Sequence, residues 1–197
     1  INDFREKVLQ QPKRKAGVYT YTDGRNEIPT VYPLSKALFP EVNSWDGHVF
    51  IPGFFFPDSE GELLPEEVER FLSDGKPPVA VTFSSMPLAR PAGFLEKLRA
   101  ALGSTGNRAV FLTGNSGIKC DSDDLICTVN AAPHSALFPR VKGVIHHGGI
   151  GTMAAALRAG RPQMILPFSV DQPFWAERLY RLGYSLKPMR EKDVTAA

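Results

Sequence analysis

The feature that most constrains the fold is an alternation of short, continuously apolar segments with segments of helical apolar spacing, which begins at Leu64. Strands that are apolar along their whole length are buried on both faces, and strands that alternate with helices pair in parallel. The pattern therefore predicts an α/β domain with a doubly wound parallel sheet, a Rossmann-like arrangement. The segments predicted to form strands are residues 78–83, 108–113, 125–129, 141–145 and 163–166.

The first 60 residues have a different texture. They are rich in proline and aromatic residues, and two short apolar runs, residues 28–34 and 48–56, lie between turn signals. We expect connecting structure with one or two strands. A chain of 197 residues suits one α/β domain with an appendage. We therefore assign residues 1–60 to an N-terminal linker segment and residues 61–197 to the Rossmann-like domain.

Composition narrows the classes of function. The chain is 43% hydrophobic and 22% charged, as expected for a soluble globular protein, and its net charge of +2 gives no basic field for nucleic acid. No apolar run approaches the roughly 20 residues of a membrane helix, so the protein is not expected to be transmembrane. Two cysteines without metal or disulfide spacing favour a reducing, cytoplasmic location. The opening isoleucine suggests a piece of a longer chain.

The richest candidate site is the loop His-His-Gly-Gly-Ile-Gly-Thr at residues 146–152, between a predicted strand and a predicted helix. Glycines let the backbone approach a ligand closely, and a helix N-terminus offers N–H groups and a partial positive charge. Thr152 adds a hydroxyl, and His147 can donate a hydrogen bond. The loop therefore predicts a phosphate cradle. The alternative is a glycine-rich turn with two histidines at the edge of the core.

The same loop also fits a dinucleotide fingerprint. Gly149, Gly151 and Ala154 have the spacing G-x-G-x-x-A, and Asp171 follows at about the distance of a ribose-binding acid. In dinucleotide enzymes, however, the glycine loop follows the first strand and the acid ends the second. Here three predicted strands precede the strand that leads into the loop, so the match is interpreted as accidental. A dinucleotide-dependent oxidoreductase domain is kept as the alternative function.

Other polar residues lie near predicted strand ends. Asp171 and Gln172 open a helix, where Asp171 can act as N-cap and both can hold sugar hydroxyls. Ser84 and Ser85 follow the first predicted strand and form either a second phosphate contact or a simple polar turn. His134 is either structural or part of a wall against a nucleobase. The acidic run at residues 121–124 has no companion ligands, so no metal site is expected.

Residues 133–183 closely resemble the donor-binding half of nucleotide-sugar glycosyltransferases of the GT-B fold, within the UDP-glycosyltransferase superfamily. Sterol, lipid and antibiotic glycosyltransferases are the most similar types. The run Val-Tyr-Pro-Leu-Ser-Lys-Ala-Leu-Phe-Pro at residues 31–40 also resembles the family, which implies that residues 1–60 are the end of an acceptor domain and the linker to the donor domain. The double-histidine glycine loop, the Gly-Arg-Pro turn at residues 160–162 and the Asp171-Gln172 pair occur in the order and spacing of that family. The segment Val-Thr-Phe-Ser-Ser-Met at residues 81–86 resembles its strand-end motif, with Ser84 where the family usually has glycine.

The resemblance implies a role for each matching residue. Asp171 and Gln172 would hold the sugar. Ala155 stands where plant enzymes place a ribose-binding glutamate. The donor phosphates would be held by Ser85, His147, Gly149, Ile150, Gly151 and Thr152. The nucleobase would lie against Val129, Ala132, Pro133 and His134.

The resemblance also implies an activity. A hexose, most commonly glucose, would pass with inversion from a UDP-sugar to a hydroxyl of a small hydrophobic or lipid-like acceptor, with no cofactor and no metal. The catalytic base of the family is a histidine of the acceptor domain, which this sequence does not contain. We therefore expect no catalytic residue here and an inactive fragment, with peripheral membrane contact possible for the longer protein. A catalytically silent nucleotide-binding domain is a further alternative.

Overall fold

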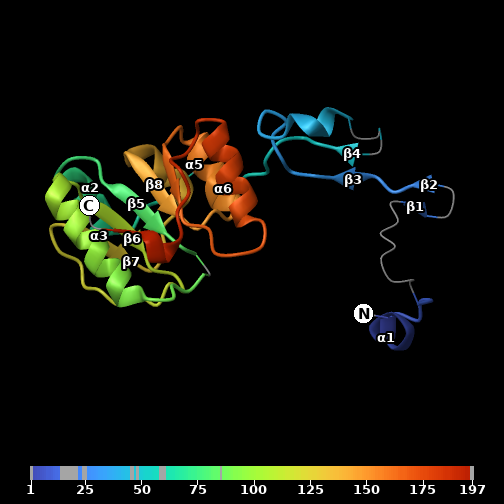
Figure 1. The fold of residues 1–197 in the computed structure, drawn as a ribbon, viewed down its shortest axis with the longest axis horizontal. Coiled ribbons are helices and arrows are strands. Elements are labelled where there is room, and N and C mark those ends of the chain that lie inside the picture. The colour runs from blue at the N-terminus through green and yellow to red at the C-terminus, as the bar shows by residue number, and fades with distance from the viewer. Residues whose placement is uncertain are drawn as a thin grey trace. The chain divides into compact units, whose positions relative to one another are not determined.

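The computed structural model describes residues 2–13, 22–23, 26–44, 47, 49–57, 61–84 and 86–195. The chain divides into two compact units, Ile1–Phe55 and Phe56–Ala197. Figure 1 shows the course of the chain through both units, and each unit is described by itself. The assignment of residues 1–60 to the end of an acceptor domain and a linker stays a prediction.

The first unit consists of short elements. Helix α1 spans Asn2–Lys7, and a 3₁₀ helix, η1, spans Pro40–Ser44. Strand β1 (Thr22–Asp23) pairs antiparallel with β2 (Asn26–Glu27), and β3 (Thr30–Val31) pairs parallel with β4 (Val49–Phe50). Among its described side chains, the buried apolar ones are Leu38 and Val42. The described residues of this unit therefore include four two-residue strands, more than the sequence predicted, and bury few apolar side chains.

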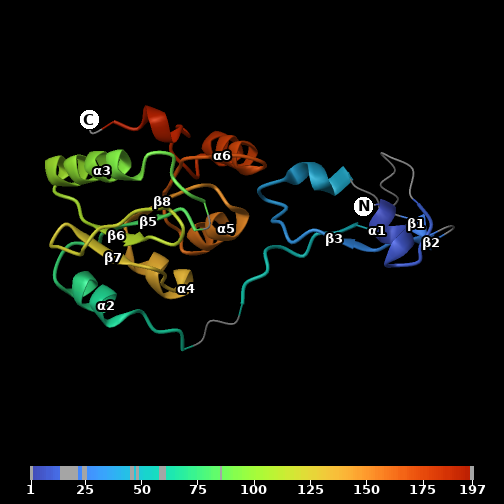
Figure 2. The same ribbon diagram turned by 90° about the horizontal axis from the view of Figure 1, so that it is seen from below.

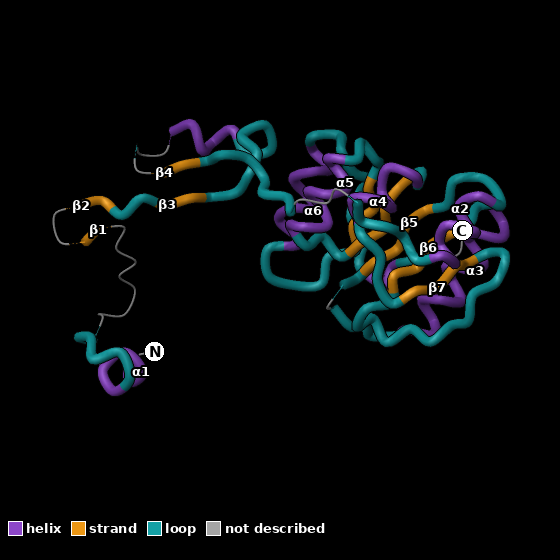
Figure 3. The backbone as a smooth tube through the Cα atoms, turned by 180° about the vertical axis from the view of Figure 1, so that it is seen from behind, coloured by secondary structure: helices purple, strands orange, loops and turns teal. Residues whose placement is uncertain are grey.

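The second unit contains five strands in the order β7-β6-β5-β8-β9, and every neighbouring pair is parallel. This confirms the predicted doubly wound parallel sheet, whose strands are coloured in Figure 3. The strands are β5 (Val79–Thr82), β6 (Ala109–Leu112), β7 (Ile126–Val129), β8 (Gly143–His146) and β9 (Gln163–Ile165). The helices are α2 (Glu66–Ser73), α3 (Pro91–Thr105), α4 (His134–Leu137), α5 (Ile150–Arg158) and α6 (Gln172–Arg181), with 3₁₀ turns η2 (Phe138–Arg140) and η3 (Glu191–Asp193).

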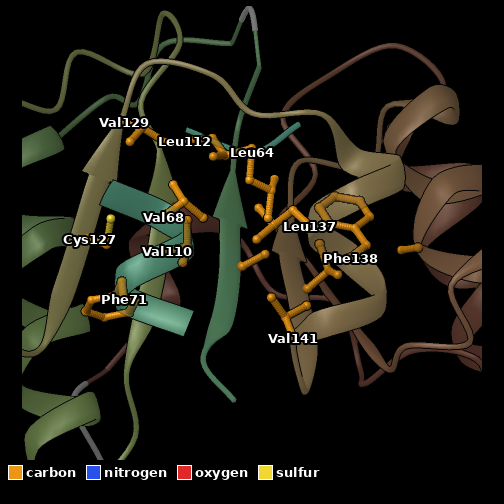
Figure 4. Packing of buried hydrophobic residues seen from close by; sticks show 13 residues of the cluster. Leu64, Val68, Phe71, Val110, Leu112, Cys127, Val129, Leu137, Phe138 and Val141 are labelled. Carbon is orange, nitrogen blue, oxygen red and sulfur yellow. The ribbon is translucent and has the colours of Figure 1, made fainter. Parts of the chain in front are cut away.

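Two hydrophobic clusters pack on opposite faces of this sheet. Successive strand residues point to opposite faces, so Ala80 joins one cluster and Val81 the other. The first cluster lies between the sheet and α2, α4 and α5, and Figure 4 shows Val68, Phe71 and Leu137 within it. The second lies beneath α3, which is on the same side as α6 in Figure 2. Helices on both faces explain why all five strands are almost wholly apolar.

The crossover from β7 to β8 contains a helix that the sequence analysis did not identify. Helix α4 has one turn and continues into η2, which begins at Phe138 and contains Pro139. Leu137 and Phe138 are fully buried in the first cluster. A single turn between two prolines is too short to show helical periodicity in the sequence. The helix is therefore recognised only in the structure, where its residues are buried.

The segment after α6 returns along the sheet edge. Ser185 forms a parallel bridge with Gln163, and the Leu186 N–H donates to the Gln163 carbonyl at 2.8 Å. Further on, the Glu191 carboxylate accepts from the backbone N–H groups of Ala89 and Arg90 at 2.9 and 2.8 Å. These bonds fix the entry to α3, which no side chain of its own caps. The far end of the chain thus completes the loop between β5 and α3.

Candidate functional site

The strand order places a switch point between β5 and β8. From β5 the chain moves outward to β6 and β7, and it then returns to the other side of β5 as β8. Thr82 and His146 are register partners at the carboxyl ends of these two strands. In doubly wound sheets, ligands bind beyond the carboxyl ends of the strands at such a point. The loops after β5, β8 and β9 are therefore the candidate site.

Three glycines in the loop after β8 do different work. Gly148 has a φ of +92°, and a Cβ there would lie 2.9 Å from the Ile165 methyl. A Cβ on Gly149 would meet the Nε2 edge of the His147 ring, so this glycine makes room for the imidazole. For Gly151, apart from its chain neighbours and the backbone of α5 itself, no heavy atom of the described residues lies within 4 Å of the Cβ position. The first two glycines are needed by the fold, and the third leaves open space at the start of α5.

Helix α5 begins at this open space. Its N-cap position is Gly149, which has no side chain with which to cap the helix. The first N–H groups of an α-helix have no acceptor within the helix and carry partial positive charge. Ile150 is 37% exposed, whereas Thr152 is buried just inside the first turn. The predicted phosphate residues from Gly149 to Thr152 therefore lie on one uncapped helix start.

His147 lies beside this helix start with a nearly buried ring. Its side chain is 6% exposed, and its Nδ1 has no hydrogen-bond partner in the described part of the chain. Burial lowers the pKa of His147, against the opposing influence of the nearby Thr82 carbonyl and Asp171 carboxylate. The imidazole is therefore neutral at neutral pH. A neutral imidazole can donate one hydrogen bond to a phosphate oxygen.

His146 is turned the other way, into the core. It is 0% exposed, its Nε2 lies 2.8 Å from Gln163 Oε1, and its Nδ1 accepts from the Gly148 N–H at 3.1 Å. Burial lowers its pKa to about 4. His146 therefore holds the loop after β8 from its core side, through its bond to the Gly148 N–H. The sequence analysis did not identify Gln163, because a glutamine inside an apolar strand shows no partner in the sequence.

Asp171 occupies the N-cap position of α6, but its side chain makes no capping bond, so the N-cap interpretation is wrong for this carboxylate. Its Oδ2 instead accepts from the indole N–H of Trp175 at 3.1 Å. Trp175 lies one turn further along α6 and is buried, so this bond ties the carboxylate of the exposed Asp171 to the core side of the helix. The remaining oxygen of an exposed carboxylate can accept from a ligand hydroxyl.

The side chain of Gln172 is buried and already half engaged. Its Oε1 accepts from the backbone N–H groups of Phe168 and Ser169 at 2.8 and 3.2 Å. These two bonds shape the loop after β9, so the amide can serve a ligand only as a donor through its NH₂ group. Val170, in the same loop, has a φ of +58° and is 92% exposed. The two predicted sugar residues thus follow a turn that is strained for a β-branched residue.

The predicted nucleobase wall is formed unevenly. The side chain of Val129 is buried in the core, and Ala132 packs against the same cluster. Pro133 precedes α4, and the His134 ring stacks on Phe138 at 4.3 Å between ring centres. Burial lowers the pKa of His134, with a smaller contribution from His147. His134 therefore presents a flat, neutral ring near the glycine loop.

Ser85, the remaining predicted phosphate residue, lies outside the described residues. Its neighbour Ser84 has a φ of +52°, a conformation in which glycine is the least strained residue. The Ser84 carbonyl accepts from the Asn115 N–H at 2.9 Å and lies 2.5 Å from where a Cβ on Gly114 would be. The loops after β5 and β6 are therefore in close contact. No group of three or more metal-binding side chains occurs within the described residues.

Comparison with known proteins shows what this chain is similar to. A family model described as the C-terminal domain of erythromycin biosynthesis protein CIII-like proteins matches residues 119–197. The chain is 39% identical over 162 residues to O-mycaminosyltylonolide 6-deoxyallosyltransferase of Streptomyces fradiae, a match that covers 82% of this chain and 38% of that protein. It is 34% identical over 196 residues to a sterol 3-beta-glucosyltransferase of Arabidopsis thaliana, covering 96% of this chain and 30% of that protein.

Solved structures have the same fold. The glycotransferase of kitacinnamycin superposes with a TM-score of 0.70 at 20% identity, covering 99% of this chain and 49% of that one. A glycosyltransferase of Arabidopsis thaliana, solved in complex with UDP, superposes with a TM-score of 0.61 at 17% identity, covering 84% of this chain and 46% of that one. This chain spans well under half the length of both curated relatives named above. Among the described residues, no helix is long and apolar enough to cross a membrane.

Proposed function

Because this chain is homologous to the C-terminal, donor-binding half of GT-B glycosyltransferases, we propose that it binds a nucleoside-diphosphate sugar, most simply UDP-glucose, at the carboxyl ends of β5, β8 and β9. The observation that carries the proposal is the uncapped start of α5, with open space at Gly151 and the neutral ring of His147 beside it. Backbone N–H groups and an imidazole donor suit a diphosphate.

Within this proposal each loop takes one part of the donor. The backbone of Gly149, Ile150 and Gly151, the hydroxyl of Thr152 and the ring of His147 hold the phosphates, with Ser85 from the loop after β5. Asp171 accepts from sugar hydroxyls, and Gln172 donates to them. The nucleobase lies over the His134 ring and the backbone from Val129 to Pro133. Because Ala155 stands where plant enzymes place a ribose-binding glutamate, the ribose is held here by groups other than an acid at that position.

The longer protein, we propose, transfers a hexose with inversion to a hydroxyl of a small hydrophobic or lipid-like acceptor in the cytoplasm. Negative charge grows on the leaving diphosphate as the bond from the anomeric carbon breaks. Hydrogen-bond donors that already point at the diphosphate oxygen leaving the anomeric carbon stabilise the transition state without having to reorganise. No metal is needed in this scheme, since the helix start and His147 supply the positive potential. The acceptor pocket and the general base belong to a domain outside these residues.

The direct test is binding of UDP to this chain, measured by calorimetry with NAD as the competing ligand. We expect UDP to bind and NAD to bind much more weakly, with no change on addition of EDTA. NAD binding equal to that of UDP would favour the oxidoreductase alternative and contradict the proposal. Loss of UDP binding in EDTA would contradict the metal-free part alone.

Catalysis offers a second test. General-base assistance contributes about 10²–10⁴-fold, and positioning of the acceptor adds to it, so this chain alone should not turn over. We expect UDP-glucose binding without transfer to a sterol or to another hydrophobic alcohol. Multiple turnovers by these 197 residues alone would show that the base lies within them.

A further inference from the structure

The hydrogen bonds around His146 determine where its single proton lies. The Gly148 backbone N–H can only donate, so His146 Nδ1, which lies 3.1 Å from it, must be unprotonated. The proton of the neutral ring is then on Nε2. That Nε2–H points at an atom of Gln163 at 2.8 Å, which must be an acceptor. The same argument fixes the orientation of the Gln163 amide, with its oxygen toward the histidine.

Gln163 is well placed to hold this arrangement. It is 1% exposed, it lies on β9, and its backbone is tied on one side to Val144 of β8 and on the other to Ser185. A buried imidazole N–H without an acceptor is costly, so the amide oxygen selects the tautomer that protonates Nε2. The opposite tautomer would leave two N–H groups facing each other at Gly148.

The turn at Gly148 sets the direction of the helix start. Its φ of +92° and the Ile165 methyl, which lies where a Cβ would need room, restrict this position to glycine, and its N–H is bound by His146 Nδ1. Gly149 and the first residues of α5 follow immediately. A change of tautomer behind the loop would therefore disturb the N–H groups proposed to hold the phosphates.

We propose that Gln163 is a positioning residue for the donor phosphates: it holds the proton of His146 on Nε2, so that Nδ1 fixes the Gly148 N–H and with it the start of α5. The inference rests on the proposed function only in its last step, the binding of the nucleotide. Its first two steps concern the free protein. Gln163 itself touches no substrate and acts only through His146.

Charge around the pair is consistent with this role. The titratable groups that act on His146 are His147 and His134, and both disfavour a second proton on it, as burial does. An imidazolium has N–H groups at both nitrogens and could not accept from Gly148. The neutral amide of Gln163 accepts the Nε2 proton without a negative charge that would attract another.

The sharpest test is Gln163→Glu, which preserves shape and acceptor but introduces a charge. A carboxylate beside His146 raises the pKa of the imidazole, so that the ring takes up a second proton at pH values where the native ring stays neutral. We expect UDP affinity close to native at pH 8 and about tenfold weaker at pH 6, expressed as a ratio to the native chain at each pH. The ratio cancels protonation of the nucleotide itself. Protonation of His147 would strengthen diphosphate binding and so has the opposite sign.

A second variant, Gln163→Leu, removes the acceptor altogether. We expect about tenfold weaker UDP binding at all pH values, equivalent to about 1.4 kcal/mol. The control is Thr128→Val on β7, at the other edge of the sheet, since the Thr128 hydroxyl is buried without a hydrogen-bond partner among the described residues. It changes a buried polar group of the same sheet and should leave UDP affinity unchanged.

Nitrogen NMR of the ligand-free chain separates this inference from the proposed function. We expect one His146 signal typical of the tautomer protonated at Nε2 in the native chain, and loss of that signal with a shifted Gly148 amide in Gln163→Leu. If the tautomer and the Gly148 amide are unchanged in both Gln163 variants, the inference is wrong, whatever UDP does. If both change as expected but no form of the chain binds UDP, the proposed function is wrong and the positioning of Gly148 stands.

Discussion

Three neighbouring loops at the carboxyl edge of the sheet turn through left-handed backbone, and they differ in the residue that makes the turn. After β8 the residue is Gly148 at a φ of +92°, whereas after β5 it is Ser84 at +52° and after β9 it is Val170 at +58°. At Gly148 a side chain would strike Ile165. At Val170 the side chain points into solvent and is 92% exposed.

The comparison separates two reasons for a glycine. One is steric exclusion by neighbours, which no other residue can satisfy, and it applies at Gly148. The other is only backbone preference, which costs an L-residue about 1–2 kcal/mol in the left-handed region. Ser84 and Val170 carry that second cost. Residues held in sparsely populated conformations cluster at binding sites, where surrounding structure maintains them.

The largest effect should follow Gly148→Ala. Strain at positive φ and the clash with Ile165 together should lower the free energy of unfolding by about 4 kcal/mol, measured by urea denaturation. Gly151→Ala is the matched control, because its Cβ would meet no described atom apart from its chain neighbours and the backbone of α5 itself. It should change stability by less than about 0.5 kcal/mol, yet weaken UDP binding. Equal destabilisation by the two variants would remove the distinction between the glycines.

The second effect is a pH dependence of the free energy of unfolding, caused by His146, which is buried under the loop after β8. The pKa of His146 is about 4 in the folded chain, against an ordinary value of 6.5 for a histidine in water. The unfolded chain takes up the proton first, so stability is full above pH 6.5 and falls as the pH drops toward 4, by about 3 kcal/mol. His146→Asn keeps an acceptor for the Gly148 N–H but does not titrate, so its stability should depend less on pH. An unchanged slope in urea titrations at several pH values would contradict this assignment.

The third prediction contrasts the loops after β8 and β9 by ligand. His147→Ala should weaken UDP binding by about 1–3 kcal/mol, the usual range for losing a hydrogen bond to a charged group. Asp171→Asn should spare UDP and weaken binding of UDP-glucose, because its carboxylate is proposed to face the sugar. Calorimetry with both ligands checks the pair. A weaker UDP complex in Asp171→Asn would place the carboxylate near the phosphates instead.

The smallest effects concern the strained turns themselves. Val170→Gly relieves a left-handed β-branched residue but adds entropy to the unfolded chain, so we expect a net gain of about 0.5 kcal/mol in stability. Ser84→Gly should be closer to neutral, since a serine is less strained there than a valine. Thermal unfolding of both variants measures the difference. A loss of stability in Val170→Gly would mean that the valine side chain makes a stabilising contact.

The sequence was sufficient for the sheet and for the position of the site, for identifiable reasons. The strand Ala109–Leu112 is apolar throughout, and Val79–Thr82 is apolar except for its last residue, which indicates burial on both faces and parallel pairing. The glycine loop was visible because its residues are consecutive. The Gln163–His146 bond joins residues that are 17 apart in sequence and lie on different strands. The Asp171 carboxylate was expected to accept from backbone N–H groups of α6, but it accepts from the indole N–H of Trp175. Choices between competing hydrogen-bond partners depend on the packed structure, which local sequence does not contain.

The carboxylate of Glu191 has a consequence for the order in which the molecule is made. It closes the turn before α3 across 101 and 102 residues of chain, so the loop that contains Ser84 waits for a residue synthesised much later. At about 5–20 residues per second, that interval is about 5–20 seconds on the ribosome. During it, two backbone N–H groups ahead of a long helix lack their acceptor. In a nascent chain stalled before Glu191, the segment between β5 and α3 should therefore be open to protease. Once η3 has been synthesised and has left the ribosome, its Glu191 carboxylate should bind the Ala89 and Arg90 N–H groups and protect that segment.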